Sequence, residues 1–279
     1  MSSKRAAFFF LSVLLLGAAG CAALFPLNDR YAAAERVADR AGFEKSFIHA
    51  SGFTLTAFTR FKKKGDPLHL YIEGDGTAWL SRTRLSDDPT PRTPLVLDLA
   101  TQDAASNVAY LARPGQYDAN GSPGCDSAYW SEKRFSGEVV DAMNRAVDDL
   151  RRQADAGAIH LIGYSGGAAV AVLAAARRSD VASLRTVAGN LDPDTVNRYH
   201  RVSSMEGSLN PMDVAANLKN LPQRHFVGSQ DAVIPPGIAE SFLRRAGKPD
   251  FSGITIVEGA THTRGWRERW KELLALPAA

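Results

Sequence analysis

A serine enclosed by glycines is the clearest candidate for a chemical role in this sequence. Residues 158–169 read A-I-H-L-I-G-Y-S-G-G-A-A, so the G-x-S-x-G pattern at Ser165 stands between an apolar, strand-like run and a run of small residues typical of a helix. A sharp strand-to-helix turn exposes the serine hydroxyl, and the first N–H of the helix, that of Gly166, lies where an oxyanion would form. An ordinary glycine-rich turn would show the same five letters, but the flanking runs favour a nucleophile.

An acid and a histidine follow two later strand-like runs. Asp231 comes after the run 223–227, in the segment G-S-Q-D-A-V-I-P, and His262 comes after the run 254–257. Because the carboxyl ends of parallel strands meet at one edge of a sheet, these two side chains and Ser165 can converge there. Serine becomes a nucleophile when a histidine accepts its proton, and an aspartate can fix the tautomer of that histidine. The three residues therefore predict a catalytic triad.

Other residues compete for two of these roles. Asp192 follows the strand-like run 184–188 and is an alternative acid, although it can also cap the turn that begins there. His200 is the rival base. His160 and His225 lie inside strand-like runs, which favours a position in the core or on a sheet face.

Strand-like and helix-like runs alternate along most of the chain. This alternation predicts an α/β protein in which helices cover both faces of a mostly parallel sheet, and we find no internal repeat and no second domain. The predicted strands are 47–50, 53–61 (these two as a hairpin), 68–72, 108–112, 159–162, 184–188, 223–227 and 254–257, and the predicted helices are 28–41 (a short surface helix), 94–100, 135–154, 168–176, 238–245 and 266–274.

The order serine, acid, histidine, each after a strand, resembles that of the α/β-hydrolases. The resemblance extends from Leu68 to the C-terminus. It implies the α/β-hydrolase fold, with Ser165, Asp231 and His262 as the triad. It also implies that the weakly periodic segment 193–221 is an insertion that can act as a lid.

A second glycine cluster, Glu73-Gly74-Asp75-Gly76, follows the predicted strand 68–72. By the same resemblance, this loop supplies the other oxyanion donor, and the backbone N–H of Asp75 is the best candidate. The corresponding loop of lipases usually begins with histidine and then glycine, so Glu73 departs from the pattern. Because the donor is a backbone group, the side chain of Glu73 need not matter for the chemistry. The alternative is an ordinary glycine turn.

The long loop 113–134 is expected to form part of the wall of the pocket.

The N-terminus predicts export and lipidation. Lys4 and Arg5 precede an uncharged apolar run, which ends in the small residues 17–20 and then Cys21. This resembles the lipobox of bacterial lipoproteins, although Ala18 stands where leucine is commonest; an uncleaved membrane anchor is the alternative. We therefore expect a signal peptide at 1–20, a lipidated anchor and linker at 21–45, and a hydrolase domain at 46–279. The residue after Cys21 is not aspartate, which favours an outer-membrane location facing the periplasm.

Composition excludes several other classes of protein. The formal charge of the 279-residue chain is only +3 and no basic stripe is present, so no nucleic-acid partner is expected. Motifs for metal ions and for nucleotides are missing, so neither a metal site nor a cofactor is predicted.

Cys125 is expected to be an unreactive free thiol.

These patterns together predict an envelope serine hydrolase. It would cleave an ester or related acyl bond of a small-molecule or lipid substrate through an acyl-serine intermediate. Two alternatives stay open: a non-catalytic envelope lipoprotein that uses the same scaffold to bind, and a serine peptidase. The fold alone does not choose the substrate.

Overall fold

The computed structural model describes residues 25–118, 121–122, 124–248 and 253–278. The predicted leader 1–20 and Cys21 lie outside the described residues. The strands are β1 (Glu44–Ala50), β2 (Phe53–Phe61), β3 (Leu68–Ile72), β4 (Asn107–Leu111), β5 (Ile159–Tyr164), β6 (Val181–Val187), β7 (Gln223–Gly228) and β8 (Ile254–Val257). The helices are α1 (Phe25–Arg40), α2 (Leu95–Thr101), α3 (Gly137–Ala154), α4 (Gly166–Ala175), α5 (Pro193–His200), α6 (Pro211–Val214), α7 (Gly237–Arg245) and α8 (Trp270–Ala275), with 3-10 turns η1 (Ser127–Trp130) and η2 (Ala215–Leu218).

The described strands form one sheet in the order β1-β2-β4-β3-β5-β6-β7-β8. Strands β1 and β2 form the predicted antiparallel hairpin, and its turn residues Ser51 and Gly52 have φ values of 50° and 86°, which suit a two-residue turn. Strand β2 also pairs antiparallel with β4, and every later pairing is parallel. The predicted mostly parallel sheet is therefore confirmed.

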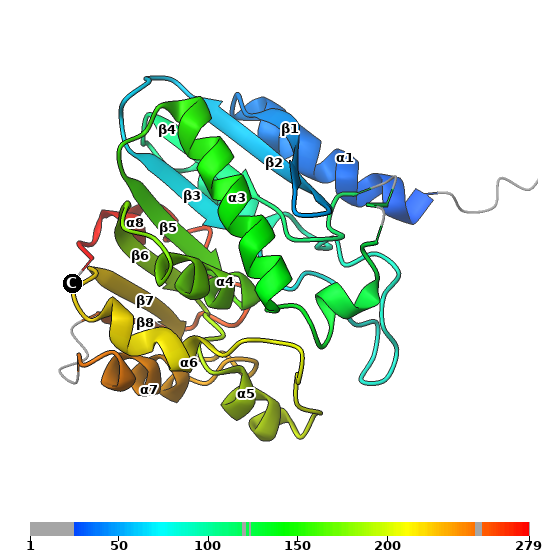
Figure 1. The fold of residues 1–279 in the computed structure, drawn as a ribbon, viewed down its shortest axis with the longest axis vertical. Coiled ribbons are helices and arrows are strands. Elements are labelled where there is room, and N and C mark those ends of the chain that lie inside the picture. The colour runs from blue at the N-terminus through cyan, green and yellow to red at the C-terminus, as the bar shows by residue number, and fades with distance from the viewer. Residues whose placement is uncertain (1–24, 119–120, 123, 249–252, 279) are drawn as a thin grey trace, which may run out of the picture.

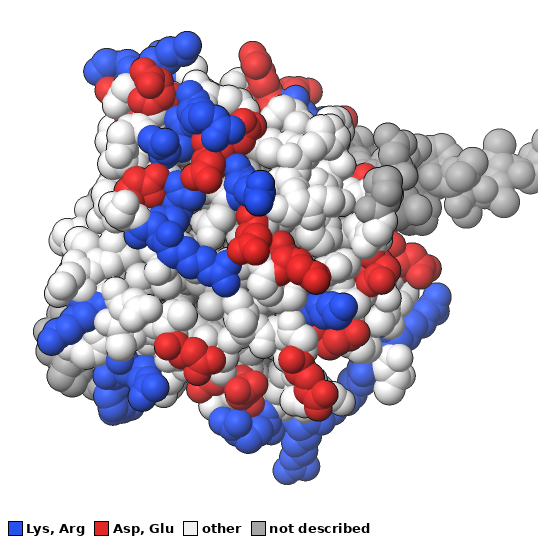
Figure 2. Space-filling model, in the orientation of Figure 1, with Lys and Arg blue, Asp and Glu red and all other residues white. Residues whose placement is uncertain are grey.

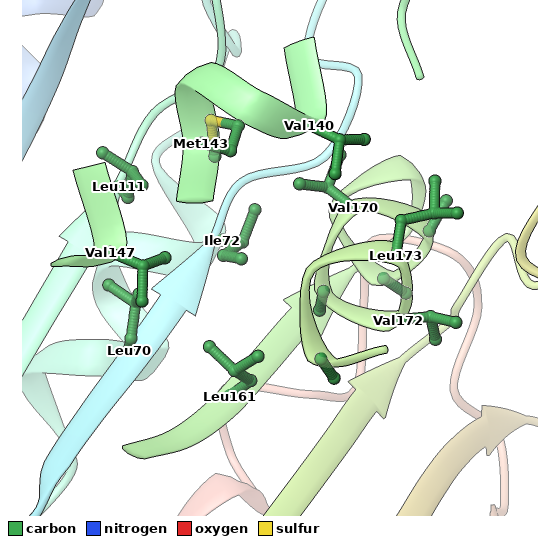
Figure 3. Close-up of a cluster of buried hydrophobic side chains, with 14 of the residues drawn as sticks. Leu70, Ile72, Leu111, Val140, Met143, Val147, Leu161, Val170, Val172 and Leu173 are labelled. Carbon is green, nitrogen blue, oxygen red and sulfur yellow. The ribbon is translucent and has the colours of Figure 1, made fainter. Parts of the chain in front are cut away.

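Each face of the sheet carries its own hydrophobic core. Helices α3 and α4 lie in front of the central strands in Figure 1, and the apolar side chains of α3 recur at helical spacing toward the sheet. Helix α4 is buried on all sides, which explains its continuous run of small and apolar residues. Figure 3 shows part of the core that α3 and α4 make with the strands, including Leu70, Ile72, Leu161, Met143 and Val170.

The opposite core involves α1, α2 and α8. Ala34 and Ala38 of α1 are almost fully buried there, so the predicted surface helix packs one face against the rest of the protein. Small alanine side chains on one face allow the helix to approach its neighbours closely. The N-terminal helix is therefore packed against the same body as the sheet.

Several bounds differ from the sequence expectation, since β1 and β6 each start three residues earlier than predicted. The last helix and segment 193–221 differ as well. The last helix starts at Trp270 rather than 266, since the indole N–H of Trp266 donates to the carbonyl oxygens of Thr261 and His262 and keeps that stretch in turns. Segment 193–221 is not irregular throughout, because Asp192 caps α5 and Pro193 occupies its first turn.

Charged side chains of both signs are interspersed on the face shown in Figure 2. In the part of the chain that the structure describes, no helix is long and apolar enough to cross a membrane.

Candidate active site

Ser165 occupies a strained turn between β5 and α4. Its φ of 50° and ψ of −121° are unusual for a residue with a side chain, and such a conformation costs on the order of 1–3 kcal/mol unless its surroundings hold it. Here the Ser165 N–H donates to the Val187 carbonyl oxygen at 3.0 Å, and the Ser165 carbonyl accepts from the Asn190 N–H at 2.9 Å. Val187 is the last residue of the neighbouring strand β6, and Asn190 lies just after it, so the sheet itself fixes the turn.

Glycines allow the first turn of α4 to lie against the end of β3. A Cβ atom on Gly167 would stand 2.4 Å from the Ile72 carbonyl oxygen and 2.3 Å from that of Glu73, which is far inside van der Waals contact. A Cβ atom on Gly166 would stand 2.0 Å from Oδ1 of Asp75. The close approach brings the loop after β3 beside the serine.

The three predicted triad residues lie in one hydrogen-bonded chain. The Ser165 Oγ atom is 3.0 Å from Nε2 of His262, and Nδ1 of His262 is 2.9 Å from Oδ2 of Asp231. These distances lie within the hydrogen-bond reach that a nucleophile and its base require. Loops after β5, β7 and β8 therefore deliver the three side chains to one edge of the sheet.

Backbone donors set the orientation of the Asp231 carboxylate. Its Oδ1 atom accepts from the N–H groups of Val233 and Ile234 at 2.8 and 2.9 Å, and the side chain is fully buried. This leaves Oδ2 to face the imidazole. The turn that follows Asp231 thus orients its carboxylate toward His262.

The rival residues lie in other hydrogen bonds. Both carboxylate oxygens of Asp192 accept from Thr195, one from its N–H and one from its hydroxyl. Nε2 of His200 is 2.7 Å from the carbonyl oxygen of Val233. Neither residue contacts the serine or its histidine, so the geometry favours Asp231 and His262.

Two other histidines occupy structural positions on the sheet. Nδ1 of His225 is 2.8 Å from the Thr186 hydroxyl, and burial lowers the pKa of His225 to about 3. Burial and the neighbouring His69 lower the pKa of His160 to about 4, and its Nδ1 is 2.7 Å from the Ser183 hydroxyl. Both histidines are therefore neutral at pH 7.

Two backbone donors beside Ser165 are free to bind an oxyanion. The N–H groups of Gly166 and Asp75 have no hydrogen-bond acceptor among the described residues. The loop is close to the nucleophile, since a Cβ atom on Gly74 would stand 3.2 Å from Cβ of Ser165. The predicted pair of donors therefore lies next to the predicted nucleophile.

Two side chains hold this oxyanion loop, residues 73–77, and the sequence analysis did not single out one of them, Gln116. The Gly74 N–H donates to Oε1 of Glu73 at 2.9 Å, and the Gly74 carbonyl accepts from Nε2 of Gln116 at 2.9 Å. The peptide that carries the Asp75 N–H is thus restrained on the side of Gly74. Gln116 belongs to the long loop 113–134, which supports the oxyanion loop.

The carboxylate of Asp75 is held by two arginines. It lies 2.6 Å from Nη1 of Arg113 and 3.4 Å from Nε of Arg134. Burial alone would raise the pKa of Asp75, but Arg134 and Arg113 outweigh burial and lower it. Asp75 is therefore ionised at neutral pH, and its charge is compensated.

Glu73 is a buried carboxyl on the wall of the cavity. Burial raises the pKa of Glu73 to about 7, against the opposing hydrogen bond from the Gly74 N–H. The Tyr110 hydroxyl also donates to its Oε2 at 2.9 Å. Glu73 thus fixes the start of the oxyanion loop, while the idea that its side chain need not matter for the chemistry stays a prediction. Its replacement of the usual histidine was the only signal in the sequence.

A cavity of about 540 Å³ opens onto the serine. No described residue of segments 113–134 or 193–221 lines it, so neither the long loop nor the expected lid forms its wall. The segment between β3 and α2 does so instead. The lining residues are Glu73, Asp75, Gly76, Thr77, Trp79, Pro91, Arg92, Thr93, Leu95, Tyr164, Ser165, Val233, His262 and Thr263.

The described residues contain no group of three or more histidine, cysteine, aspartate or glutamate side chains that could hold a metal ion. Cys125 is half-buried, and burial raises the pKa of its thiol to about 11. A thiol with so high a pKa is a poor nucleophile at neutral pH.

Comparisons with known proteins identify the fold. Similar solved structures include an esterase from Pyrococcus furiosus (14% identity, TM-score 0.58, covering 85% of this chain and 91% of that one). An α/β serine hydrolase homologue from Coxiella burnetii is similar as well (17% identity, TM-score 0.53, covering 82% and 93%). The chain has the α/β-hydrolase fold.

A membrane phospholipase A described as a bacterial virulence factor is also similar (15% identity, TM-score 0.58, covering 90% of each chain). No family model matches the sequence, and no curated protein matches it either. At such low identities, the α/β-hydrolase likeness is one of fold.

Glu73→Gln should change how stability depends on pH. The carboxyl loses its proton near pH 4.5 in the unfolded chain and near pH 7 in the folded one, so the folded state binds the proton more tightly. The free energy of unfolding of the wild type, relative to Glu73→Gln, should therefore fall between pH 4.5 and 7 by up to about 3 kcal/mol and stay level above it. Urea unfolding of both proteins across this range measures the difference. A difference that is constant or rises with pH would contradict the buried, protonated carboxyl.

Proposed function

We propose that this protein is a serine hydrolase that cleaves an ester or related acyl bond. The observation that carries the proposal is the hydrogen-bonded chain Ser165–His262–Asp231. Its serine lies at the wall of a cavity, beside two backbone N–H groups that have no acceptor among the described residues. A nucleophile, a base with its orienting acid and an oxyanion site are the parts that acyl transfer needs.

The acylation half of the reaction follows from these positions. Nε2 of His262 accepts the hydroxyl proton of Ser165 as Oγ attacks the acyl carbon. The negative charge that forms on the acyl oxygen is bound by the N–H groups of Gly166 and Asp75, and losing one such donor typically costs about 3 kcal/mol. His262 then gives the proton to the leaving oxygen, and the acyl-serine remains.

The second half reverses these roles. A water molecule enters the cavity and gives a proton to Nε2 of His262 as its oxygen attacks the acyl-serine. The tetrahedral intermediate again places its charge between the N–H groups. Its collapse breaks the bond to Oγ, which recovers the proton from His262, and the carboxylic acid leaves. Asp231 stabilises the imidazolium in both halves.

An ester is the best-supported bond for two reasons. Structurally similar proteins include an esterase and a membrane phospholipase A. In addition, the cavity is open and lined by both polar and apolar side chains. A serine peptidase and a non-catalytic binding protein are the alternatives.

A fluorophosphonate probe tests the proposal without a known substrate. The probe should form a covalent bond with Oγ of Ser165, because His262 activates that oxygen, and mass spectrometry of peptides should locate it. Ser165→Ala should not be labelled, and Ser203→Ala, which changes an exposed serine elsewhere, should be labelled like the wild type. A folded wild type that resists labelling would favour the binding protein over the enzyme.

We further propose that the protein is a lipoprotein, anchored through acyl chains on Cys21 to the outer membrane and facing the periplasm. The support is the small-residue stretch before Cys21, after a basic start and an apolar run. A single acyl chain gives only marginal membrane binding, whereas several chains anchor firmly.

Replacing Cys21 tests the anchor. Cys21→Ser should leave the leader uncleaved, because the cysteine sulfur is the acceptor of the lipid, and should remove the acylated mature species from membrane fractions. Intact mass spectrometry and fractionation of cells that express either protein measure both effects. Normal processing of Cys21→Ser would rule out lipidation at this residue.

A further inference from the structure

Five exposed apolar side chains lie on segments that border the cavity or are hydrogen-bonded to a segment that does, and we call them the apolar rim. They come from three segments that lie far apart in the sequence, and each is between 40% and 58% exposed. Two of them, Trp79 and Val233, also line the cavity that opens onto Ser165. The rim consists of Trp79, Leu80, Tyr199, Val202 and Val233.

Hydrogen bonds join the three segments of the rim. Nη2 of Arg82 donates to the carbonyl oxygen of His200 at 3.4 Å, and Nε2 of His200 is 2.7 Å from the carbonyl oxygen of Val233. The first segment is itself a tight turn, since the Leu80 N–H donates to the Arg84 carbonyl oxygen at 2.8 Å. The three segments that carry the apolar side chains are therefore linked to one another by hydrogen bonds.

Arginines surround the rim. Segments 79–92 and 198–206 together contain five arginines and three carboxylates. Arginine side chains near a bilayer surface are attracted by anionic headgroups, and each adds to the binding. An apolar centre with a basic margin is the pattern that suits a phospholipid surface. The five arginines are Arg82, Arg84, Arg92, Arg198 and Arg201, and all are exposed.

Helix α1, which begins four residues after Cys21, contacts a residue next to this cavity. Nη1 of Arg30, in α1, donates to the Thr90 carbonyl oxygen at 3.2 Å, and the next three residues after Thr90 line the cavity. Four residues of chain from Cys21 to Phe25 span at most about 14 Å, and the helix from Phe25 to Arg30 rises by about 7.5 Å. This length of chain limits the distance between Arg30 and the proposed anchor at Cys21 to about 22 Å.

We propose that the apolar rim docks on the phospholipid bilayer that holds the anchor, so that the substrate is an acyl ester taken directly from the membrane. The choice of substrate rests on the proposed hydrolase function, and the docking rests on the proposed anchor. Trp79 and Val233 contact the acyl chains of the bilayer and continue into the cavity wall. The lipid then reaches Ser165 without crossing water.

Quenching of tryptophan fluorescence by brominated phospholipids tests the docking. The acylated full-length protein, carrying Ser165→Ala so that no hydrolysis occurs, is placed in phosphatidylglycerol-containing vesicles. Trp266 and Trp270 are fully buried, so Trp79 and Trp130 are the two that the quencher can reach. With Trp130→Phe added, fluorescence should be strongly quenched, and with Trp79→Phe added instead, it should be quenched little.

Rim variants supply the matched comparison. Leu80→Ser with Val202→Ser should reduce the quenching of Trp79, because both side chains leave the bilayer contact. Phe47→Ser with Ile256→Ser should not reduce it, since these residues are equally apolar, are each 54% exposed, and lie on the two edge strands β1 and β8. Unquenched Trp79 in the anchored protein would overturn the docking, as would a stable dimer in detergent that shields Trp79 from soluble acrylamide.

Activity of the same variants in the Ser165 protein tests the substrate. Leu80→Ser with Val202→Ser should lower turnover of an ester embedded in vesicles by on the order of tenfold, since two apolar contacts are lost. Turnover of a short soluble ester should not change, because neither residue lines the cavity. Equal loss on both esters would overturn uptake from the membrane. An enzyme that cleaves neither ester, yet shows quenched Trp79, would overturn the assigned substrate and the hydrolase function while leaving the docking intact.

Discussion

The backbone conformation of Ser165 is the constraint on which the rest of the site depends. A serine with φ of 50° is stable only where other parts of the chain hold it. On one side, Val187 at the end of β6 accepts a hydrogen bond from Ser165, and Asn190 just after β6 donates one to it. On the other side, Gly167 lets α4 lie against the end of β3. Strand β5 lies between β3 and β6, so the nucleophile stands near the middle of the sheet edge. The loops after β3, β7 and β8 then reach it with the oxyanion donors, the acid and the histidine.

The charges around the oxyanion loop have to be balanced, because the proposed mechanism forms a negative charge there. Two carboxyl groups, Glu73 and Asp75, lie on the cavity wall. Arg113 and Arg134 compensate Asp75, whereas burial favours the neutral form of Glu73. A protonated Glu73 adds no negative charge beside the oxyanion. The same carboxyl restrains Gly74, so one residue contributes both to the geometry of the loop and to its electrostatics.

Much of the fold, and the convergence of Ser165, His262 and Asp231, could be predicted because each depends on local patterns. Strand β3 and strand β8 have the bounds that their apolar runs predict, and Ser165, Asp231 and His262 each follow such a run. The support of the oxyanion loop could not be predicted, since Arg113, Gln116 and Arg134 reach it only through the three-dimensional path of a long loop. The structural role of Glu73 could not be predicted either, because it depends on burial. The apolar rim joins three distant segments that no local pattern connects.

The central proposal is that Ser165, His262 and Asp231 act as one unit, and replacing each of the two candidate acids by asparagine tests it most directly. Asp231→Asn should lower kcat by roughly 10³–10⁴-fold, because the histidine loses the carboxylate that fixes its tautomer and stabilises its charged form. Asp192→Asn should change kcat by less than about threefold, because asparagine also caps a helix. The result that would contradict the account is a large loss of kcat in Asp192→Asn while Asp231→Asn keeps the activity of the wild type.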